Sequence, residues 1–454
     1  MGNVGMTVSN VTEAISRFIV ESSFENLPKE VVEAGKRSFL DWISVTLGGT
    51  KEPPARILID FVEELGGEKQ ASILGHGIRT STLNAAFVNG AMSHILDYDD
   101  AHSETRNHTS APLFPVVLAI AENKGLNGQD LLTAYITGFE VSSRIGLALG
   151  KRYYEEGWHA TSILGRFGAA AGSSCLMGLK TEQVIHALGL AGTQSGGIRS
   201  AFGTMAKPFH AGKAAADGLL SAMLAQRNFT GPKDIFEDNS EYVGIFSEEY
   251  DSGHIMKGLG KNYHILTNSF KLHAACLLLH PVIDGLLSIK REHNPSPEEI
   301  ESIELEVAPL CLSVTDKPRV VDGVEGKFSL HFCSALAMTK GKLGNREFTD
   351  ALVNDRRIRD LMKKVRVRGN LSLDEAEANV VVGVVNGRRY SRHITAPKGH
   401  PRNPMTFDEI LEKFKDLNRG VISEERIAEI AEIVKNLQDL LNIRKLIELC
   451  DFGC

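Results

Sequence analysis

The chain has 454 residues, of which 43% are hydrophobic and 24% charged, and it carries a formal net charge of −7. This length predicts two or three domains with a large core, and the mildly acidic balance argues against binding to nucleic acid or anionic membranes. No run reaches the roughly 18 apolar residues that a membrane helix needs. Residues 1–9 lack the regions of a signal peptide, and none of the six cysteines forms a Cys-x-x-Cys pair. These features predict a cytoplasmic protein without a disulfide framework or a structural zinc site.

The first half of the sequence is predicted to be helical almost throughout. Pro28 opens the first clear helix, because proline suits a first helical turn, and Gly48-Gly49 ends it. The glycines and alanines of residues 165–172 favour close approach of helices in a buried bundle. Apolar residues at helical spacing predict further helices over residues 54–65, 83–96, 112–123, 130–149, 161–179, 181–191 and 211–226, with a short strand over 71–75.

The pattern changes beyond about Asn268. Ile303, Leu305 and Val307 alternate with polar residues, which predicts a half-buried strand. Asn386-Gly387 separates two further apolar runs and is typical of a hairpin turn. An antiparallel sheet is therefore expected, with helices over residues 276–291, 328–338 and 348–363 and a strand beginning at residue 365. Residues 397–404 look like a linker, and Thr406 is expected to cap a final helical region.

One acidic stretch lies between two of the predicted helices. The first helix ends in His94-Ile95-Leu96-Asp97-Tyr98-Asp99-Asp100-Ala101-His102, and Asn107-His108-Thr109-Ser110-Ala111-Pro112 opens the next. Three nearby carboxylates repel one another, and burial raises carboxylate pKa values unless cations or donors compensate. The stretch therefore indicates the rim of a functional site. The alternative is an acidic helix end with ordinary N-capping of the next helix by Thr109 or Ser110.

Together with three further segments, this stretch resembles the MmgE/PrpD family. The segments are Gly157-Trp158-His159-Ala160-Thr161 leading into Gly165-Arg166-Phe167-Gly168, Lys207-Pro208-Phe209-His210-Ala211-Gly212-Lys213, and Phe270-Lys271 with His280-Pro281-Val282-Ile283-Asp284. The resemblance runs in order over nearly the full chain. It implies an enzyme similar to 2-methylcitrate dehydratases, cis-aconitate decarboxylases and iminodisuccinate epimerases, which act on small polycarboxylates without a metal or organic cofactor.

The resemblance also implies a mainly α fold and a homodimer. A large all-helical domain is built from both chain ends, here residues 1–268 and 405–454. A smaller α+β lid domain with an antiparallel sheet covers residues 269–404. The order of the predicted elements gives the same division.

The family's site is carried over to this chain by motif. Asp97 matches the first aspartate of the Asp-aromatic-Asp-Asp signature, and His108 matches the histidine that follows it. His159 matches the Gly-aromatic-His segment, Lys207 the segment that precedes the next helix, and Lys271 the lysine that opens the lid. Removing a proton next to a carboxylate adds charge to a group that is already anionic. The site therefore needs cations and a base with a pKa near neutrality.

These chemical needs assign the roles. Histidine suits the base because its unperturbed pKa is about 6.5, so we expect His108 to be the general acid/base and Asp97 to orient it. The alternative for His108 is a helix-start residue bonded to backbone. His159 is expected to donate to the substrate or carry a second proton, against the alternative of a core histidine stacked on Trp158. Lys207 is counted among the catalytic residues, because its ammonium would hold a substrate carboxylate and offset the charge that develops during the reaction.

Four residues are expected to bind substrate: Lys271, His210, Lys213 and Arg199. Lysine ammoniums are compact charges suited to oxyanions, although most lysines lie on the surface. His210 and Lys213 lie three apart at the expected start of a helix, where anions are favoured, with capping and packing as the ordinary alternative. Arg199 offers a carboxylate fork, and a salt bridge in a loop is its alternative.

Two positions depart from the family pattern. Ala101 occupies a position where many members have threonine, and Phe332 one where many have tyrosine. The residue after His108 is also not the proline found in the dehydratase and decarboxylase branches. These departures leave open whether the substrate is a hydroxy-tricarboxylate, an unsaturated tricarboxylate or an amino- or imino-dicarboxylate.

Several functions fit this sequence. The first is a cofactor-free, 2-methylcitrate dehydratase-like lyase, and a decarboxylase or epimerase could use the same site. A metal-dependent hydrolase could use the carboxylates and histidines of the acidic stretch as metal ligands. Their spacing, however, fits no known metal-ligand signature. A non-catalytic polycarboxylate-binding protein is compatible with the departures. We expect no metal and no cofactor, and a small polycarboxylate as the partner.

Overall fold

The computed structural model describes residues 11–453, so the signal-peptide prediction on residues 1–9 lies outside the described residues. Contacts between residues divide the chain into two compact units. Among the described residues, the first unit, here called the helical unit, contains residues 11–95, 100–268 and 420–453. The second, the α+β unit, contains residues 96–99 and 269–419. The fold is mainly α with a small α+β part, which confirms the predicted fold class.

The helical unit holds most of the helices expected from the sequence. Its first elements are α1 (Val11–Glu21), α2 (Lys29–Gly48), α3 (Pro53–Leu65), α4 (Thr82–His94), α5 (Ser110–Lys124), α6 (Gly128–Leu149) and α7 (Arg152–Glu155). They are followed by α8 (Ala160–Met177), α9 (Thr181–Thr193), α10 (Ala206–Gln226), α11 (Glu241–Phe246), α12 (Gly253–Met256), α20 (Glu424–Lys435) and α21 (Arg444–Cys450). The expected short strand is β1 (Ala71–Ile73), which pairs antiparallel with β2 (Ile78–Thr80). Two two-residue strands, β3 (Ala101–His102) and β4 (Asn268–Ser269), form a second pair.

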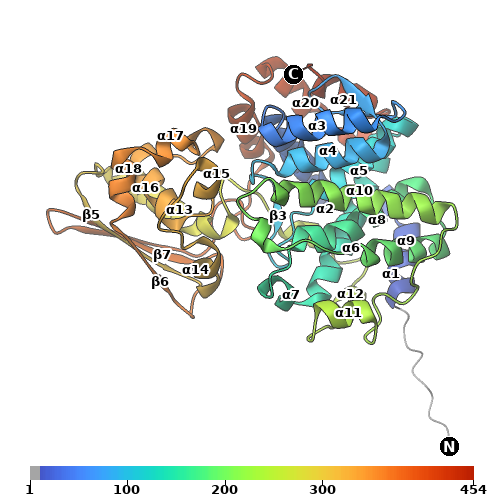
Figure 1. Cartoon of the computed structure of the whole chain (residues 1–454), viewed down its shortest axis with the longest axis horizontal. Helices are drawn as coiled ribbons and strands as arrows, with labels where there is room; N and C mark the ends of the chain where they lie inside the picture. The colour runs from blue at the N-terminus through green and yellow to red at the C-terminus, as the bar shows by residue number, and fades with distance from the viewer. Residues whose placement is uncertain (1–10, 454) are drawn as a thin grey trace, which may run out of the picture. The chain divides into compact units, whose positions relative to one another are not determined.

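Three long helices, α6, α8 and α10, form the centre of the helical unit (Figure 1). Small residues let their backbones approach closely. A Cβ added to Gly138 of α6 would lie 2.6 Å from the carbonyl oxygen of Gly168 on α8, and one added to Gly218 of α10 would lie 2.4 Å from the Cβ of Ala169. The glycine- and alanine-rich run of α8 therefore packs against neighbours on two sides, as its composition predicted.

The α+β unit is built on a four-stranded sheet of order β6-β5-β7-β8. The strands are β5 (Ile300–Val307), β6 (Val365–Gly369), β7 (Ala378–Val384) and β8 (Arg389–Ile394), with Asn386-Gly387 in the hairpin turn. Helices α13 (His280–His293) and α16 (Leu330–Lys340) lie over one face of the sheet (Figure 1). The remaining helices are α14 (Pro309–Thr315), α15 (Gly323–Gly326), α17 (Asp350–Val353), α18 (Arg356–Met362) and α19 (Phe407–Asn418).

The alternation of β5 is confirmed by its burial. Ile303, Leu305 and Val307 are buried, while Glu304 and Glu306 pair with arginines of β8 and β6. The expected antiparallel sheet was wrong in one respect, because β6 runs parallel to β5. A helical crossover separates these two strands and returns the chain in the same direction, which a hairpin cannot do.

Two predicted helices also differ from the structure. The helix expected over residues 348–363 is divided into α17 and α18 because Asp355 caps the second piece, accepting from the backbone N–H of Arg357 at 2.8 Å. The helix expected from residue 276 begins at His280, with a single 3-10 turn before it. Within residues 11–453 none of the helices combines the length and apolarity that crossing a membrane requires.

Candidate active site

Four histidines of the helical unit lie close together. The ring centroids of His94 and His108 are 4.5 Å apart, those of His94 and His159 6.1 Å, and those of His159 and His210 5.3 Å. His94 and His159 are buried, whereas His108 and His210 are half-buried. The structure thus brings three of the predicted site residues together and adds His94 to them.

Local structure places His108 at the end of a tight turn. The backbone N–H of His102 donates to the carbonyl of Asn107 at 2.9 Å, and the Asn107 amide donates to the Ser142 hydroxyl of α6 at 2.7 Å. The backbone N–H of His108 then donates to the hydroxyl of Thr161, in the first turn of α8, at 3.1 Å. These bonds fix the His108 backbone against two central helices and leave its ring half-buried.

His159 and His210 are joined by a hydrogen bond between their Nδ1 atoms, 3.0 Å apart. One of the two nitrogens must donate and the other accept, so the two tautomers are coupled. Burial lowers the pKa of His159 well below 6.5, and the nearby His94 and Lys207 lower it further. Burial, with help from Arg166, lowers the pKa of His210 to about 4. Both rings are therefore neutral at neutral pH, and each can donate or accept a proton.

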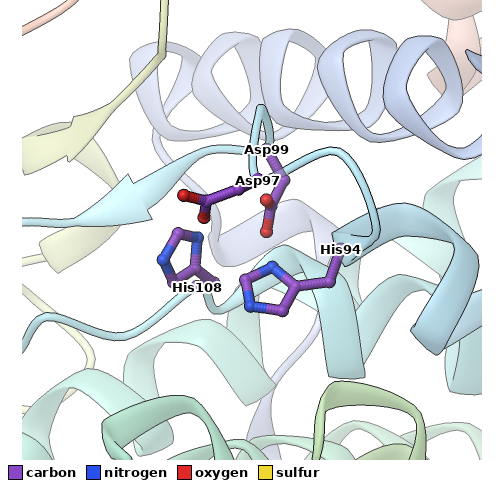
Figure 2. Close-up of side chains that lie close together, drawn as sticks. All are labelled: His94, Asp97, Asp99 and His108. Carbon is purple, nitrogen blue, oxygen red and sulfur yellow. The ribbon is translucent and has the colours of Figure 1, made fainter. Parts of the chain in front are cut away.

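The acidic stretch places two carboxylates beside this cluster (Figure 2). His94, Asp97, Asp99 and His108 each present one nitrogen or oxygen atom, and these four atoms all lie within 4.8 Å of one another. The backbone of Asp97 adopts a positive φ of 50°, which is uncommon for a residue other than glycine. A strained conformation of this kind is typical of functional sites, where the surrounding structure enforces it.

These four residues also offer a donor set for a divalent cation. Two imidazoles and two carboxylates suit zinc or manganese by type. The ammonium of Lys271, however, already lies 3.0 Å from Asp97 Oδ1 and 2.7 Å from the Asp97 carbonyl oxygen. Burial alone would lower the pKa of Lys271, but the carboxylates of Asp97 and Asp99 outweigh it and raise this pKa. A charged lysine therefore competes with a cation for Asp97.

The alternative of ordinary N-capping for the acidic stretch does not describe the structure. Thr109 occupies the N-cap of α5 but makes no side-chain capping bond. The Ser110 hydroxyl instead donates to Asp100 Oδ2 at 2.6 Å, and the amide of Asn268 donates to the same oxygen at 2.5 Å. Asp100 thus anchors the end of the acidic stretch inside the helical unit.

The predicted residues on and before α10 have different surroundings. Lys207 is buried, with its ammonium 5.0 Å from the centre of the Phe202 ring. Because α10 begins at Ala206, five residues earlier than expected, His210 and Lys213 lie inside the helix and not at its start. The side chain of Lys213 is 46% exposed and is held by Asp217 of the next turn. The helix-start argument for these two residues was therefore wrong.

Arg199 and His159 contact neighbours that the sequence did not suggest. The guanidinium of Arg199 stacks on Tyr154, 4.6 Å from the ring centre, and donates to the carbonyl of Glu155 at 3.1 Å. Within residues 11–453 these contacts take the place of the loop salt bridge considered as its alternative. The ring of His159 stacks on His94, while Trp158 packs against Phe246.

His94 was missing from the predicted site although it opens the acidic stretch. As the last residue of α4, it lies on the buried side of a helix whose N-terminus is capped by Ser81. A histidine at a helix end beside three carboxylates is a usable signal. The two departures from the family pattern, Ala101 and Phe332, are both buried, and Phe332 packs 6.0 Å from the ring of Phe348.

Imidazoles beside two carboxylates, together with a buried ammonium, are the kinds of group that proton transfer requires. Comparison with known proteins agrees with this class. Residues 13–253 match the MmgE/PrpD N-terminal domain and residues 273–439 match the MmgE/PrpD C-terminal domain. The chain therefore belongs to the MmgE/PrpD family and is an enzyme of that family.

Its curated relatives include cis-aconitate decarboxylases and a cis-aconitate decarboxylase-like protein. The chain is 26% identical to a cis-aconitate decarboxylase-like protein of Aspergillus oryzae, over 97% of this chain and 97% of the relative. It is 26% identical to the cis-aconitate decarboxylase of Aspergillus terreus, over 97% and 96%, and 27% identical to that of Homo sapiens, over 96% and 93%. The resemblance seen in the sequence motifs is thus confirmed at family level.

Proposed function

We propose that this protein is a cofactor-independent lyase that acts on a small polycarboxylate. His108 transfers the proton at the carbon alpha to a substrate carboxylate, and Asp97 orients its ring. Lys207 and Lys271 hold substrate carboxylates and offset the charge that develops on them. The observation that carries this proposal is the half-buried imidazole of His108 within 4.8 Å of two buried carboxylates, in a chain of this family.

The bonds that change can be written for each candidate reaction. In the elimination of water, His108 takes the proton from the alpha carbon, a carbon–carbon double bond forms, and the hydroxyl leaves with a proton from an acid such as His159. This dehydratase-like reaction is the one proposed first. In decarboxylation, the bond to a carboxylate breaks, carbon dioxide leaves, and His108 or His159 returns a proton to carbon. The names of the relatives favour this second candidate.

One experiment separates these reactions. The purified protein is incubated in deuterated water with citrate-type hydroxy acids, with cis-aconitate-type unsaturated acids and with amino dicarboxylates, and NMR follows deuterium uptake and products. Loss of water gives a new alkene without loss of carbon, and decarboxylation releases carbon dioxide. Epimerisation exchanges the alpha proton without either. No turnover and no exchange with any of these acids would contradict the proposal.

A parallel sample treated with a chelator and analysed for metal tests the hydrolase alternative. Under the proposal, activity stays unchanged after chelation. If activity were lost and zinc or manganese restored it, the site would be metal-dependent and the proposal would be contradicted.

We also propose that the protein forms a homodimer. Ile57, Phe61 and Leu65 lie four residues apart along α3 and are 56%, 50% and 61% exposed, so they provide an apolar stripe that a second copy can cover. Light scattering on the purified protein tests this, and a monomer at micromolar concentration would contradict it.

A further inference from the structure

Three buried lysines of the α+β unit donate hydrogen bonds to three consecutive backbone carbonyls. Lys327 donates to the carbonyl of Leu96 at 2.5 Å, Lys271 to that of Asp97 at 2.7 Å, and Lys413 to that of Tyr98 at 2.7 Å. The three lysines are 6%, 1% and 5% exposed. We call the segment 96–99 the acidic turn.

The lysines reach the acidic turn from three distant parts of the sequence. Lys271 follows β4, Lys327 ends α15, and Lys413 lies on the buried face of α19. Lys327 is steadied by the amide oxygen of Asn345 at 2.9 Å, and the ammonium of Lys413 lies 4.0 Å from the centre of the Tyr98 ring. The segment therefore belongs to the α+β unit by its contacts, although both of its chain neighbours belong to the helical unit.

This arrangement is costly, because each buried ammonium loses its hydration. Packing alone does not require three buried ammonium groups at one turn. What the lysines provide is twofold. They bond the carbonyls of Asp97, whose φ is positive, and of the residues on either side of it. They also supply positive charge to a turn that carries the carboxyl groups of Asp97 and Asp99.

We propose that Lys327 and Lys413 are positioning residues that, together with Lys271, hold the acidic turn so that the Asp97 carboxylate faces His108. This inference rests on the proposed role of His108 in proton transfer. Neither lysine needs to touch the substrate. Each acts through the backbone of the turn, and their positive charges lie beside the carboxyl groups that the turn carries.

The test compares Lys327→Met and Lys413→Met with Lys36→Met. Methionine keeps the length and apolar stem of lysine and removes its charge. Lys36 is the matched control because it is also buried, at 4% exposed, and also donates to a backbone carbonyl, that of Lys435 at 3.0 Å. It lies in the helical unit, on α2, and its ammonium also pairs with Glu33 of the same helix at 2.7 Å. All three variants lose a buried ammonium.

Two readouts are followed in each protein. The first is the pH profile of kcat and KM on the substrate identified above, and the second is the pKa of His108 from NMR titration of its Cε1–H resonance, assigned with His108→Asn. Thermal unfolding reports stability. We expect kcat to fall about ten- to hundredfold in both turn variants with KM changed less than threefold, because a misplaced carboxylate affects the chemical step. Removing a cation should raise the pKa of His108, because a nearby positive charge disfavours the imidazolium form.

Lys36→Met should lower the melting temperature about as much as the two turn variants do. It should leave the pH profile of kcat and KM and the pKa of His108 unchanged. The inference is overturned if the turn variants lose only stability, as the control does. Because the NMR titration needs no turnover, a shifted His108 pKa in an inactive protein would support the positioning role while contradicting the proposed function. If Lys413→Met does not fold, Lys327→Met alone decides.

Discussion

The imidazole of His108 is the group on which the proposed proton transfer depends. His108→Ala removes the base but not its backbone bond to Thr161, so the fold should persist. We expect the rate of alpha-proton exchange to fall by about a thousandfold, within the range general acid–base groups contribute. The measurement is deuterium uptake by NMR beside a melting curve. His254→Ala, at a ring that is 53% exposed, is the control, and equal rates in both variants would remove His108 from the mechanism.

Lys207 tests the electrostatic part of the site. Its buried ammonium lowers the pKa of His159 and is proposed to hold a substrate carboxylate. Lys207→Met should raise KM about ten- to hundredfold, since hydrogen bonds to charged groups contribute roughly 1.5–3 kcal/mol, and should raise the pKa of His159. Steady-state kinetics with a tricarboxylate measures the first effect. Lys233→Met, at a side chain that is 61% exposed, should change neither value, and an unchanged KM in Lys207→Met would contradict the assignment.

Sequence reasoning named several of the residues that the structure brings together, but it did not name Lys327 or Lys413. The acidic stretch indicated a site, and the resemblance to the MmgE/PrpD family singled out Asp97 and His108 within it. Lys413 was not predicted, because the helical region after Thr406 is rich in Glu/Lys pairs, which are typical of a solvent-facing surface. Its spacing from Ile410 and Phe414 places it on the buried face of that helix, and a lysine at such a position is the signal that could have found it. The approach of Lys327 depends on the tertiary fold alone. The roles assigned to the site residues stay predictions.

At the scale of elements, α6 and α8 pack through glycine. A Cβ on Gly138 would lie 2.6 Å from the carbonyl oxygen of Gly168 and 2.7 Å from the side chain of Leu113. The backbone carbonyl cannot move aside, so Gly138→Ala should destabilise the helical unit by roughly 1–3 kcal/mol. Denaturant unfolding measures this.

The matched control is Gly244→Ala on α11, where the added Cβ meets nothing within 4 Å. There alanine should stabilise by about 0.5–1 kcal/mol, because it restricts the unfolded chain. If the two substitutions changed stability alike, close helix packing would not explain the glycine of α6.

The elements themselves were predictable where the signal was local. Apolar spacing located the long helices, and Asn386-Gly387 located the hairpin between β7 and β8. The parallel pairing of β5 with β6 was missed because a strand's own residues do not specify its partner across a helical crossover. The break before α18 was missed because apolar periodicity continued across Asp355, whose capping role overrode it. The predicted domain boundaries stay a prediction.

At the scale of the molecule, buried histidines make the stability of the helical unit depend on pH. Burial lowers the pKa of His102 to about 3, and those of His210 and His264 to about 4. Their stabilising effect is complete above the unfolded value of 6.5 and is lost as the pH falls toward the folded values. The buried His159, whose pKa is lowered well below 6.5, acts in the same direction. Burial also raises the pKa of Glu140 to about 7, which adds stability as the pH falls, but this one carboxyl group opposes four histidines.

Unfolding free energy should therefore be lower at pH 5.0 than at pH 7.5. Fully buried His102 contributes about 2 kcal/mol to the difference, at 1.36 kcal/mol per pKa unit, and the half-buried rings contribute less because solvent screens them. Both tryptophans, Trp42 and Trp158, lie in the helical unit, so their fluorescence during urea unfolding follows that unit alone. His102→Gln keeps a side chain able to bond the hydroxyls of Thr105 and Thr267 but cannot take a proton. The difference between the two pH values should shrink by about 2 kcal/mol in this variant, and an unchanged difference would mean that His102 takes up no proton on unfolding.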